Sequence, residues 1–455
     1  MTTPVCDFVR HYAEANPVRL HMPGHKGRLP APASAAFALS AELHALDITE
    51  IDGADVLYDA ESILRESEEN AASLFGSART VYSTEGSSLC VRAMLWLAAM
   101  HAAGLGRVTR LAAGRNAHRS FIEAAALLDL DVSWLGAGEE LLRAQIRTEE
   151  LEALFHRAET APTAVYVTSP DYLGNCTELE PIAEICHRHG ALLLVDNAHG
   201  AYLKFLKPSR HPLDRGADLC CDSAHKTLPV LTGGAYLHAS GACPEVLIPM
   251  MERAMALFAS TSPSWLILQS LDAVNALLAA EYPERIRETA DRISGLKREL
   301  TAAGWEPAGD EPLKLTLCPK SRGYTGTELG RYLKDNGIVC EFADPDYLVL
   351  MATPENTAEE LRRLRASLEA LPEREPIRER APRPGHPVAV LRPRELLFRP
   401  FERVPAEESV GRILASPGVS CPPAVPIVIC GERIDEAALE LFRYYGVRSC
   451  DVVRE

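Results

Sequence analysis

The chain has 455 residues, and its 47 lysines and arginines against 63 aspartates and glutamates give a formal net charge of −16. This length predicts two or three domains around a large buried core. The negative balance excludes a nucleic-acid or anionic-membrane protein, because phosphate binding needs a positive field. The twelve cysteines are scattered without a C-x-x-C pair, so we predict neither a disulfide scaffold nor a metal site.

The N-terminal stretch MTTPVCDFVRHYAEANP lacks a basic start followed by an apolar run, so no secretory signal is expected. No apolar run reaches the roughly 20 residues that a membrane span requires. We therefore expect a cytoplasmic protein with reduced thiols.

The first half of the chain has the pattern of an α/β domain. Residues 1–19 predict a short helix, and residues 60–75 predict another that Gly76 closes. Ala164–Thr168 and Ala191–Val195 are continuously apolar, as strands buried on both faces of a parallel sheet are. The stretch LEPIAEICHRHG between them predicts a helix. Strand, helix and strand form the βαβ unit of a doubly wound domain.

The second half predicts a smaller α+β domain. A helical apolar stripe ends at Gly304, the runs LKLTL, GIVCEF and DYLVLMAT predict strands, and ENTAEELRRLRASLEAL predicts a helix. Residues 371–387 are rich in proline and charge and predict a linker, and VPIVI beyond it is β-like. We expect four parts, namely an N-terminal arm at 1–55, a large domain at 56–270, a small domain at 271–375 and a C-terminal domain at 388–455.

Two polar groups follow strand-like segments. Asp196 comes directly after ALLLV, where an acid can meet a cofactor or a metal, although a helix N-cap is an equal alternative. Lys226, in SAHKTL after GADLCCD, is a candidate Schiff-base nucleophile if burial lowers its pKa. For a lone lysine, a surface position is the more frequent alternative.

Two further segments complete a pattern. Gly86-Ser87-Ser88 at a helix start offers N–H groups, hydroxyls and a positive dipole end to a phosphate, with a simple serine cap as the alternative. His118 in RNAHRS begins a helix and could stack on a flat ring or serve only the structure. A phosphate cradle, an acid, an amine and a stacking imidazole are together what pyridoxal phosphate requires.

At these residues the chain resembles the fold-type-I, pyridoxal-phosphate-dependent ornithine/lysine/arginine decarboxylases. The similar segments, in the family's order, are LHMPGHKG at Leu20–Gly27, RNAHRS, LLLVDNAHG, SAHKTL and GERI at 431–434. The resemblance implies an aspartate-aminotransferase-like large domain with a mostly parallel sheet, a smaller α+β domain and a C-terminal segment. It also implies a homodimer or dimer of dimers with shared active sites. Nothing precedes LHMPGHKG that would match the family's additional N-terminal domain, so the short branch, expected in polyamine biosynthesis, is indicated.

The resemblance also implies roles for single residues. Lys226 would hold the cofactor aldehyde, Asp196 would pair with the pyridine nitrogen, and His118 would stack on the ring. Lys226 or His225 would return a proton to the substrate carbon. The phosphate and the rest of the ring would be bound by Gly86, Ser87, Ser88, Ala198, His199, Ser223 and His225.

Some positions depart from the family pattern. Glu85 lies beside the phosphate loop, Asn197 stands where the family often has glutamate, and Tyr202 stands where a histidine is common. These departures leave the substrate open. Glu341 and His25 are our candidates for substrate binding. Asp344 and Glu85 are alternatives, and a solvated charge is as frequent at each acid.

We expect decarboxylation of a basic L-amino acid, with arginine ahead of lysine and ornithine. The alternative is another pyridoxal-phosphate reaction on an arginine-like substrate, such as transamination or elimination with cyclisation. A non-catalytic relative is the least favoured interpretation, because Lys226, Asp196 and His118 are all present.

Overall fold

The computed structural model describes residues 1–17, 19, 23, 26, 41–136, 146–157, 159, 161–385, 387–421 and 425–454. Most of the LHMPGHKG segment, including the candidate His25, lies outside the described residues. The chain forms two compact units, Met1–His101 with Asp196–Glu284 and Ala102–Val195 with Arg285–Glu455. In the described part of the chain, no helix is long and apolar enough to cross a membrane. The four-part division expected from the sequence stays a prediction.

A seven-stranded sheet carries the α/β pattern, in the strand order β1-β7-β6-β5-β4-β2-β3. β7 pairs antiparallel with β1 and β6, whereas β2 pairs parallel with β3 and β4. The expected α/β fold with a mostly parallel sheet is confirmed. The strands are β1 (Arg79–Ser83), β2 (Arg110–Gly114), β3 (Asp131–Leu135), β4 (Ala164–Thr168), β5 (Leu192–Asp196), β6 (Leu219–Asp222) and β7 (Ala235–Ala239).

The strands end where the candidate residues begin. Every residue of β5 and β6 is buried, as their continuous apolar sequences predict. Asp196 is the last residue of β5, and Ser223 directly follows β6. Polar groups at these strand ends occupy the edge where open α/β sheets bind ligands.

Helices of the first unit are α1 (Pro4–Ala15), α3 (Ala41–Leu46), α4 (Ile63–Phe75), α5 (Ser87–Gly104), α9 (Ala224–Thr227), α10 (Met251–Ala256) and α11 (Trp265–Ala279). Gly76 closes α4 as predicted: its φ is 62°, and its N–H donates to the carbonyl of Ala72. The N-terminal helix α1 is tied to α11, because the N–H of Cys6 donates to Asp272 over 3.0 Å.

The second unit adds three helices to its part of the sheet, α6 (Arg119–Leu127), α7 (Thr148–Phe155) and α8 (Leu179–Arg188). α8 is the helix predicted between β4 and β5, and Gly190 follows it with a φ of 66°. The βαβ unit predicted from the sequence is confirmed in these elements.

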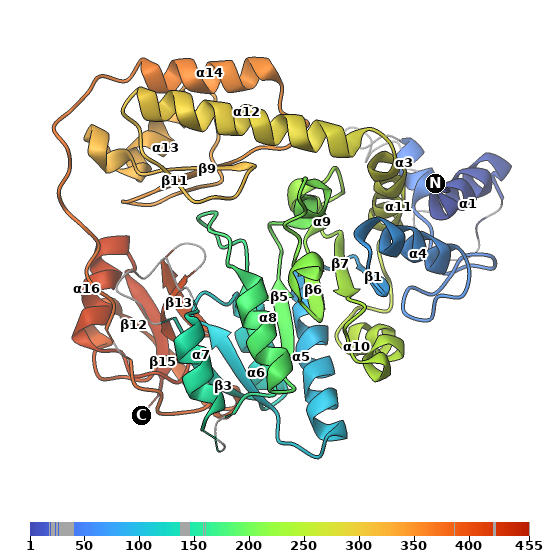
Figure 1. Cartoon of the computed structure of the whole chain (residues 1–455), viewed down its shortest axis with the longest axis horizontal. Helices are drawn as coiled ribbons and strands as arrows, with labels where there is room; N and C mark the ends of the chain where they lie inside the picture. The colour runs from blue at the N-terminus through green and yellow to red at the C-terminus, as the bar shows by residue number, and fades with distance from the viewer. Residues whose placement is uncertain are drawn as a thin grey trace. The chain divides into compact units, whose positions relative to one another are not determined.

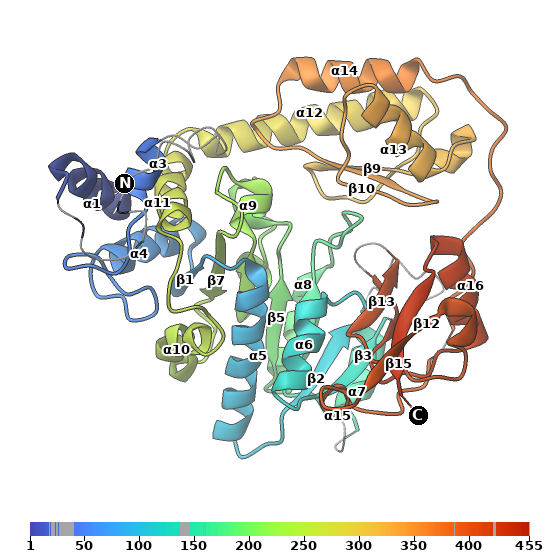
Figure 2. The ribbon, with the colours of Figure 1, turned by 180° about the vertical axis from the view of Figure 1, so that it is seen from behind.

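A four-stranded antiparallel sheet, in the order β10-β11-β9-β8, forms the α+β part of this unit. Helices α12 and α14 lie side by side in both views (Figures 1 and 2). Leucines from these two helices and the sheet share one core with the fully buried Trp305. The elements are α12 (Tyr282–Ala302), β8 (Pro307–Ala308), β9 (Lys314–Leu317), α13 (Gly326–Asp335), β10 (Phe342–Ala343), β11 (Leu348–Met351) and α14 (Ala358–Glu369).

The prediction of a strand over GIVCEF is wrong for most of its length, since β10 contains only Phe342–Ala343. The residues before it serve the end of α13 instead. Gly337 has a φ of 73°, and the N–H of Ile338 donates to the carbonyl of Leu333. A helix C-terminus therefore uses the start of the apolar run.

The C-terminal residues form two small two-stranded sheets, β12 with β15 and β13 with β14 (Figure 2). The β-like run VPIVI is β14, as predicted. α16 packs its apolar face on these strands, with Leu439 and Phe442 in the shared core. The elements are α15 (Pro393–Leu396), β12 (Phe401–Pro405), β13 (Gly418–Cys421), β14 (Val425–Ile429), α16 (Glu436–Tyr445) and β15 (Ser449–Val453).

Candidate active site

The turn between β1 and α5 contains the predicted phosphate-binding residues. Gly86 has a φ of 74°, which favours glycine, and its N–H donates to the carbonyl of Gly233 over 2.7 Å. The hydroxyl of Ser83 donates to the carbonyl of Gly86 over 3.0 Å. This turn lets α5 begin at Ser87, and the first N–H groups of a long helix have no partner within the helix. A phosphate is the kind of ligand that such an end binds.

The single-turn helix α9 brings a second hydroxyl and the candidate lysine to this place. The hydroxyl of Ser223 donates to that of Ser87 over 2.8 Å, so the start of α9 contacts the start of α5. The N–H of Lys226 donates to the carbonyl of Ser223 over 3.0 Å. The two serine hydroxyls predicted from separate motifs are therefore in contact, and Lys226 lies in the same helical turn as Ser223.

The end of β5 contributes a carboxylate and an imidazole. Asp196 is 3% exposed, and its Oδ1 lies 3.6 Å from the donating thiol of Cys221. The same Oδ1 accepts the N–H of Ala198 over 3.2 Å, so the carboxylate also has a local backbone role. The buried His199 places its Nε2 3.1 Å from Nζ of Lys226. An amine, a buried acid and a helix start thus occur together in one unit.

His225 is held beside the lysine in a defined ring orientation. Its Nδ1 lies 2.9 Å from the carbonyl oxygen of Gly234, which can only accept, so Nδ1 carries a hydrogen. Burial lowers the pKa of His225, and the neighbouring positive charge of Lys226 lowers it further. The ring is therefore neutral at neutral pH, with Nε2 able to take up a proton.

A buried polar network lies next to these residues, and sequence reasoning missed it. The amide of Asn197 donates to Oδ1 of Asp222 over 2.7 Å. Nε2 of His211 lies 3.0 Å from Oδ2 of the same carboxylate, and Nε2 of His238 lies 3.4 Å from it. Burial alone would raise the pKa of Asp222, but the two histidines outweigh it and hold the pKa well below its usual range. All four side chains are fully buried.

The ligating atoms of His211, Cys220 and Asp222 lie within 4.8 Å of one another, which raises the question of a metal. The N–H of Leu213 donates to Nδ1 of His211, so the ring hydrogen sits on Nε2 and points at Asp222. Burial raises the pKa of the Cys220 thiol well above its usual value. A protonated imidazole nitrogen and a neutral thiol are poor metal ligands, so we interpret these residues as a hydrogen-bonded network.

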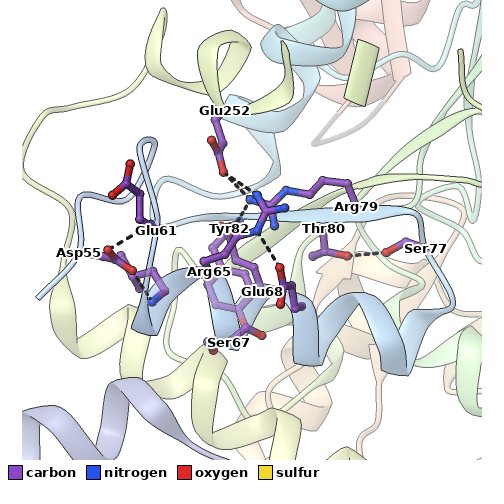
Figure 3. A network of polar contacts seen from close by, with 12 residues as sticks. Asp55, Glu61, Arg65, Ser67, Glu68, Ser77, Arg79, Thr80, Tyr82 and Glu252 are labelled. Atoms are coloured by element: carbon purple, nitrogen blue, oxygen red, sulfur yellow. Dashed lines mark hydrogen bonds and ion pairs between the residues drawn. The ribbon is translucent and has the colours of Figure 1, made fainter. Parts of the chain in front are cut away.

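A second network fixes β1, the strand that leads into the turn at Gly86 (Figure 3). The guanidinium of Arg79 lies between two carboxylates, those of Glu68 at 2.6 Å and of Glu252. The other oxygen of Glu68 accepts the N–H of Tyr82 over 2.9 Å. Burial raises the pKa of Glu68 to about 7, against the opposing effect of Arg79. These bonds anchor β1 to α4 just before Gly86.

His118 belongs to the second unit, where it begins α6 as predicted. Its Nδ1 accepts the N–H of Ser120 over 3.3 Å, and the residue is exposed. From the same segment, Arg115 forms two bonds to Glu432, of 2.6 and 3.0 Å. The ion pair joins RNAHRS to GERI, two of the segments that carry the family resemblance.

The acidic candidates for substrate binding have different surroundings. Glu341 is exposed and accepts the hydroxyl of Tyr172 over 3.0 Å. Asp344 is buried, and its Oδ1 accepts the N–H groups of residues 346 and 347, which gives it a role in its own turn. The carboxylate of Glu85 accepts the N–H of Ser260 over 2.7 Å, so it is hydrogen-bonded to the backbone of another loop.

Comparison with known proteins gives a consistent result. The family model described as "Orn/Lys/Arg decarboxylase, major domain" matches residues 3–307, and that of the C-terminal domain of the same family matches residues 389–449. An arginine decarboxylase of Halalkalibacterium halodurans is 29% identical over 97% of this chain and 93% of its own length. An arginine decarboxylase of Bacillus subtilis is 26% identical over 95% and 91%.

Solved structures agree in fold. Lysine decarboxylase A of Pseudomonas aeruginosa superposes with a TM-score of 0.81 at 18% identity, over 99% of this chain and 80% of that one. The lysine decarboxylase of Francisella novicida gives a TM-score of 0.78 at 16% identity, over 99% and 81%. The fold-type-I architecture expected from the sequence is confirmed by these likenesses.

Proposed function

Because the chain belongs to the Orn/Lys/Arg decarboxylase family, we propose that it is a pyridoxal-phosphate-dependent decarboxylase of a basic amino acid. Arginine is the first choice of substrate, ahead of lysine and ornithine, since the full-length relatives at 26–29% identity include arginine decarboxylases. The products are carbon dioxide and the corresponding amine.

The observation that carries this proposal is the meeting of four groups within one unit. The amine of Lys226, the buried carboxylate of Asp196 and the hydroxyls of Ser87 and Ser223 match the aldehyde, the ring nitrogen and the phosphate of the cofactor. When bound, pyridoxal phosphate supplies an electron sink for the bond that breaks. A buried acid suits the ring nitrogen, because it keeps that nitrogen protonated.

Separate residues of the chain are proposed to bind the phosphate, orient the amine and supply the proton. The start of α5, with Gly86, Ser87 and Ser88, binds the phosphate through N–H groups and the helix dipole. His199 orients the amine of Lys226, with Ala198 beside it, and His118 is proposed to stack on the ring. Because the pKa of His225 is lowered, Lys226 is the better donor of the proton that the substrate carbon needs.

Glu341 remains our candidate for recognising the cationic side chain. Its carboxylate is exposed and oriented by Tyr172, whereas Asp344 and Glu85 are engaged by backbone N–H groups. We expect Glu341→Gln to raise KM for arginine with a smaller change in kcat. The exposed Glu299, which pairs with Arg365 on α14, gives the control variant Glu299→Gln. An unchanged KM in Glu341→Gln would remove this residue from the substrate site.

The decisive experiment is a screen of basic amino acids labelled at the carboxyl carbon. Release of labelled carbon dioxide together with an amine of the expected mass supports decarboxylation. Product that keeps the label points to transamination or elimination instead. Lys226→Ala should abolish both turnover and the visible absorbance of the bound cofactor, whereas the exposed Lys207→Ala should leave both intact. Turnover by Lys226→Ala would refute the assignment.

A homodimer or a dimer of dimers with shared active sites is part of the same proposal. Sedimentation of the holoenzyme tests it, and a fully active monomer would contradict it.

A further inference from the structure

Asn197 is the residue through which the buried network reaches the candidate site. It stands between Asp196 and the Ala198-His199 pair, and its backbone is fixed at both ends. Its N–H donates to the carbonyl of Cys221 over 2.9 Å, and its carbonyl accepts the N–H of Gly200 over 2.8 Å. Asn197 therefore lies inside the turn that carries the acid and the imidazole, with its backbone bonded on both sides.

The turn is also closely packed. A Cβ atom added at Gly200 would lie only 2.0 Å from Oδ1 of Asn197. The amide of Asn197 thus has no room on the glycine side, while its other end donates to Asp222 over 2.7 Å. A change in the partner at position 222 must therefore be accommodated by this amide, within a closely packed turn.

The two faces of β6 are linked by this contact. Alternation along the strand places Cys220 and Asp222 on one face and Cys221 on the other. Cys221 touches Oδ1 of Asp196, whereas Asp222 holds Asn197, the next residue along the chain. The position of the Asp196 carboxylate therefore depends on side chains from both faces of β6.

The chemistry of the contact permits only certain pairs of side chains. An amide at 197 can donate to a carboxylate at 222, which also accepts from His211. A carboxylate at 197 would face a second carboxylate at hydrogen-bond distance in a fully buried place, and like charges there repel strongly. The family often has glutamate at this position, so the asparagine matches the acid that this chain carries at 222.

We infer that Asn197 and Asp222 form a positioning pair for the candidate cofactor site. The pair requires one amide and one carboxylate, and the hydrogen bond between them sets the positions of Asp196 and His199. The inference rests on the proposed function, because the positioned groups are those assigned to pyridoxal phosphate. Neither residue is assigned a contact with the cofactor.

A charge swap tests the pair. When Asn197→Asp is combined with Asp222→Asn, the new amide at position 222 donates to the new carboxylate at position 197. The oxygen of that amide accepts from His211, so every bond has a partner. We expect Asn197→Asp alone to weaken pyridoxal phosphate binding about tenfold or more, and the double variant to return to within about threefold of the native affinity. Asp222→Asn alone should weaken cofactor binding less, because the side-chain amide of Asn197 can flip and accept a hydrogen bond from the new amide at position 222.

The measurements separate positioning from stability. Each apoprotein is titrated with pyridoxal phosphate, the pH profile of its visible absorbance is recorded, and its thermal unfolding is followed without cofactor. Asp272→Asn is the control, because it removes another buried carboxylate of the same unit, one that accepts bonds from Ser67 and Cys6. It should lower the unfolding temperature and leave the affinity and the pH profile unchanged.

Asn197→Ala provides the comparison that needs no new charge. It should weaken cofactor binding and, unlike Asn197→Asp, gain nothing from Asp222→Asn. If Asn197→Asp does not fold, native-like affinity of Asn197→Ala would overturn the inference. So would a double variant no better than Asn197→Asp. If the native protein binds no pyridoxal phosphate, the proposed function is refuted as well. If the native protein binds it and turns over substrate, but the double variant does not recover affinity, only the positioning pair is refuted.

Discussion

The ion pair between Arg115 and Glu432 gives the sharpest stability prediction. The two bonds are parallel, at 2.6 and 3.0 Å, and the side chains are only 13% and 4% exposed. Glu432 also accepts the N–H of Ile429 over 2.8 Å. Glu432→Ala would leave a guanidinium largely buried without its carboxylate. Removal of one partner from a buried pair costs about 3–5 kcal/mol, and the partial exposure of Arg115 favours the lower end.

Equilibrium unfolding in urea measures this loss. The control is Glu402→Ala, which breaks the more exposed pair with Arg412 in the same C-terminal part and should cost no more than about 1 kcal/mol. Arg115→Met with Glu432→Leu removes both charges, so most of the stability should return. The reasoning is refuted if Glu432→Ala unfolds with the same midpoint as Glu402→Ala.

Three further outcomes follow from single groups. Burial raises the pKa of Glu68 from 4.5 to about 7 in the folded protein, so its stabilising effect is complete below pH 4.5 and is lost as the pH rises toward 7. We expect the unfolding free energy to fall by about 3 kcal/mol over that window. In Glu68→Gln this part of the dependence of the unfolding free energy on pH should be absent. A variant with the same dependence as the native protein would contradict the assignment. Burial raises the pKa of Asp344 from 3.8 to about 6, so its stabilising effect is likewise lost as the pH rises between these two values. Asp344→Asn should therefore flatten the dependence of the unfolding free energy in urea on pH over this range. Thr325→Ala removes the hydroxyl that caps α13 and should cost about 1 kcal/mol, whereas an unchanged thermal midpoint would show that the cap adds nothing.

Local patterns account for the parts of the fold that the sequence predicted. The apolar runs of β4 and β14 have the bounds expected from the sequence, because an uninterrupted apolar stretch between turn residues has few other uses. Gly76 and Gly304 follow α4 and α12, since only a residue without Cβ readily takes the left-handed conformation. The strand expected over GIVCEF failed because a helix end competed for its first residues.

Long-range pairs carried no such signal. Arg115 and Glu432 stand in two recognised segments but are 317 positions apart, and nothing in either segment names the other as its partner. Charge complementarity is too common along a chain of 47 basic and 63 acidic residues to identify one pair.

Asn197 shows how the two kinds of information combine. Its departure from the family pattern was visible in the sequence, yet its meaning was not, because Asp222 lies 25 positions away within another strand. Once the two side chains are seen at hydrogen-bond distance, the asparagine becomes a consequence of the aspartate, since a buried acid there tolerates an amide but not a second acid. A departure from the family pattern that left the substrate open is thus better understood as one half of a matched pair. It follows that a chain with an acid at the position of Asn197 should not also carry one at the position of Asp222.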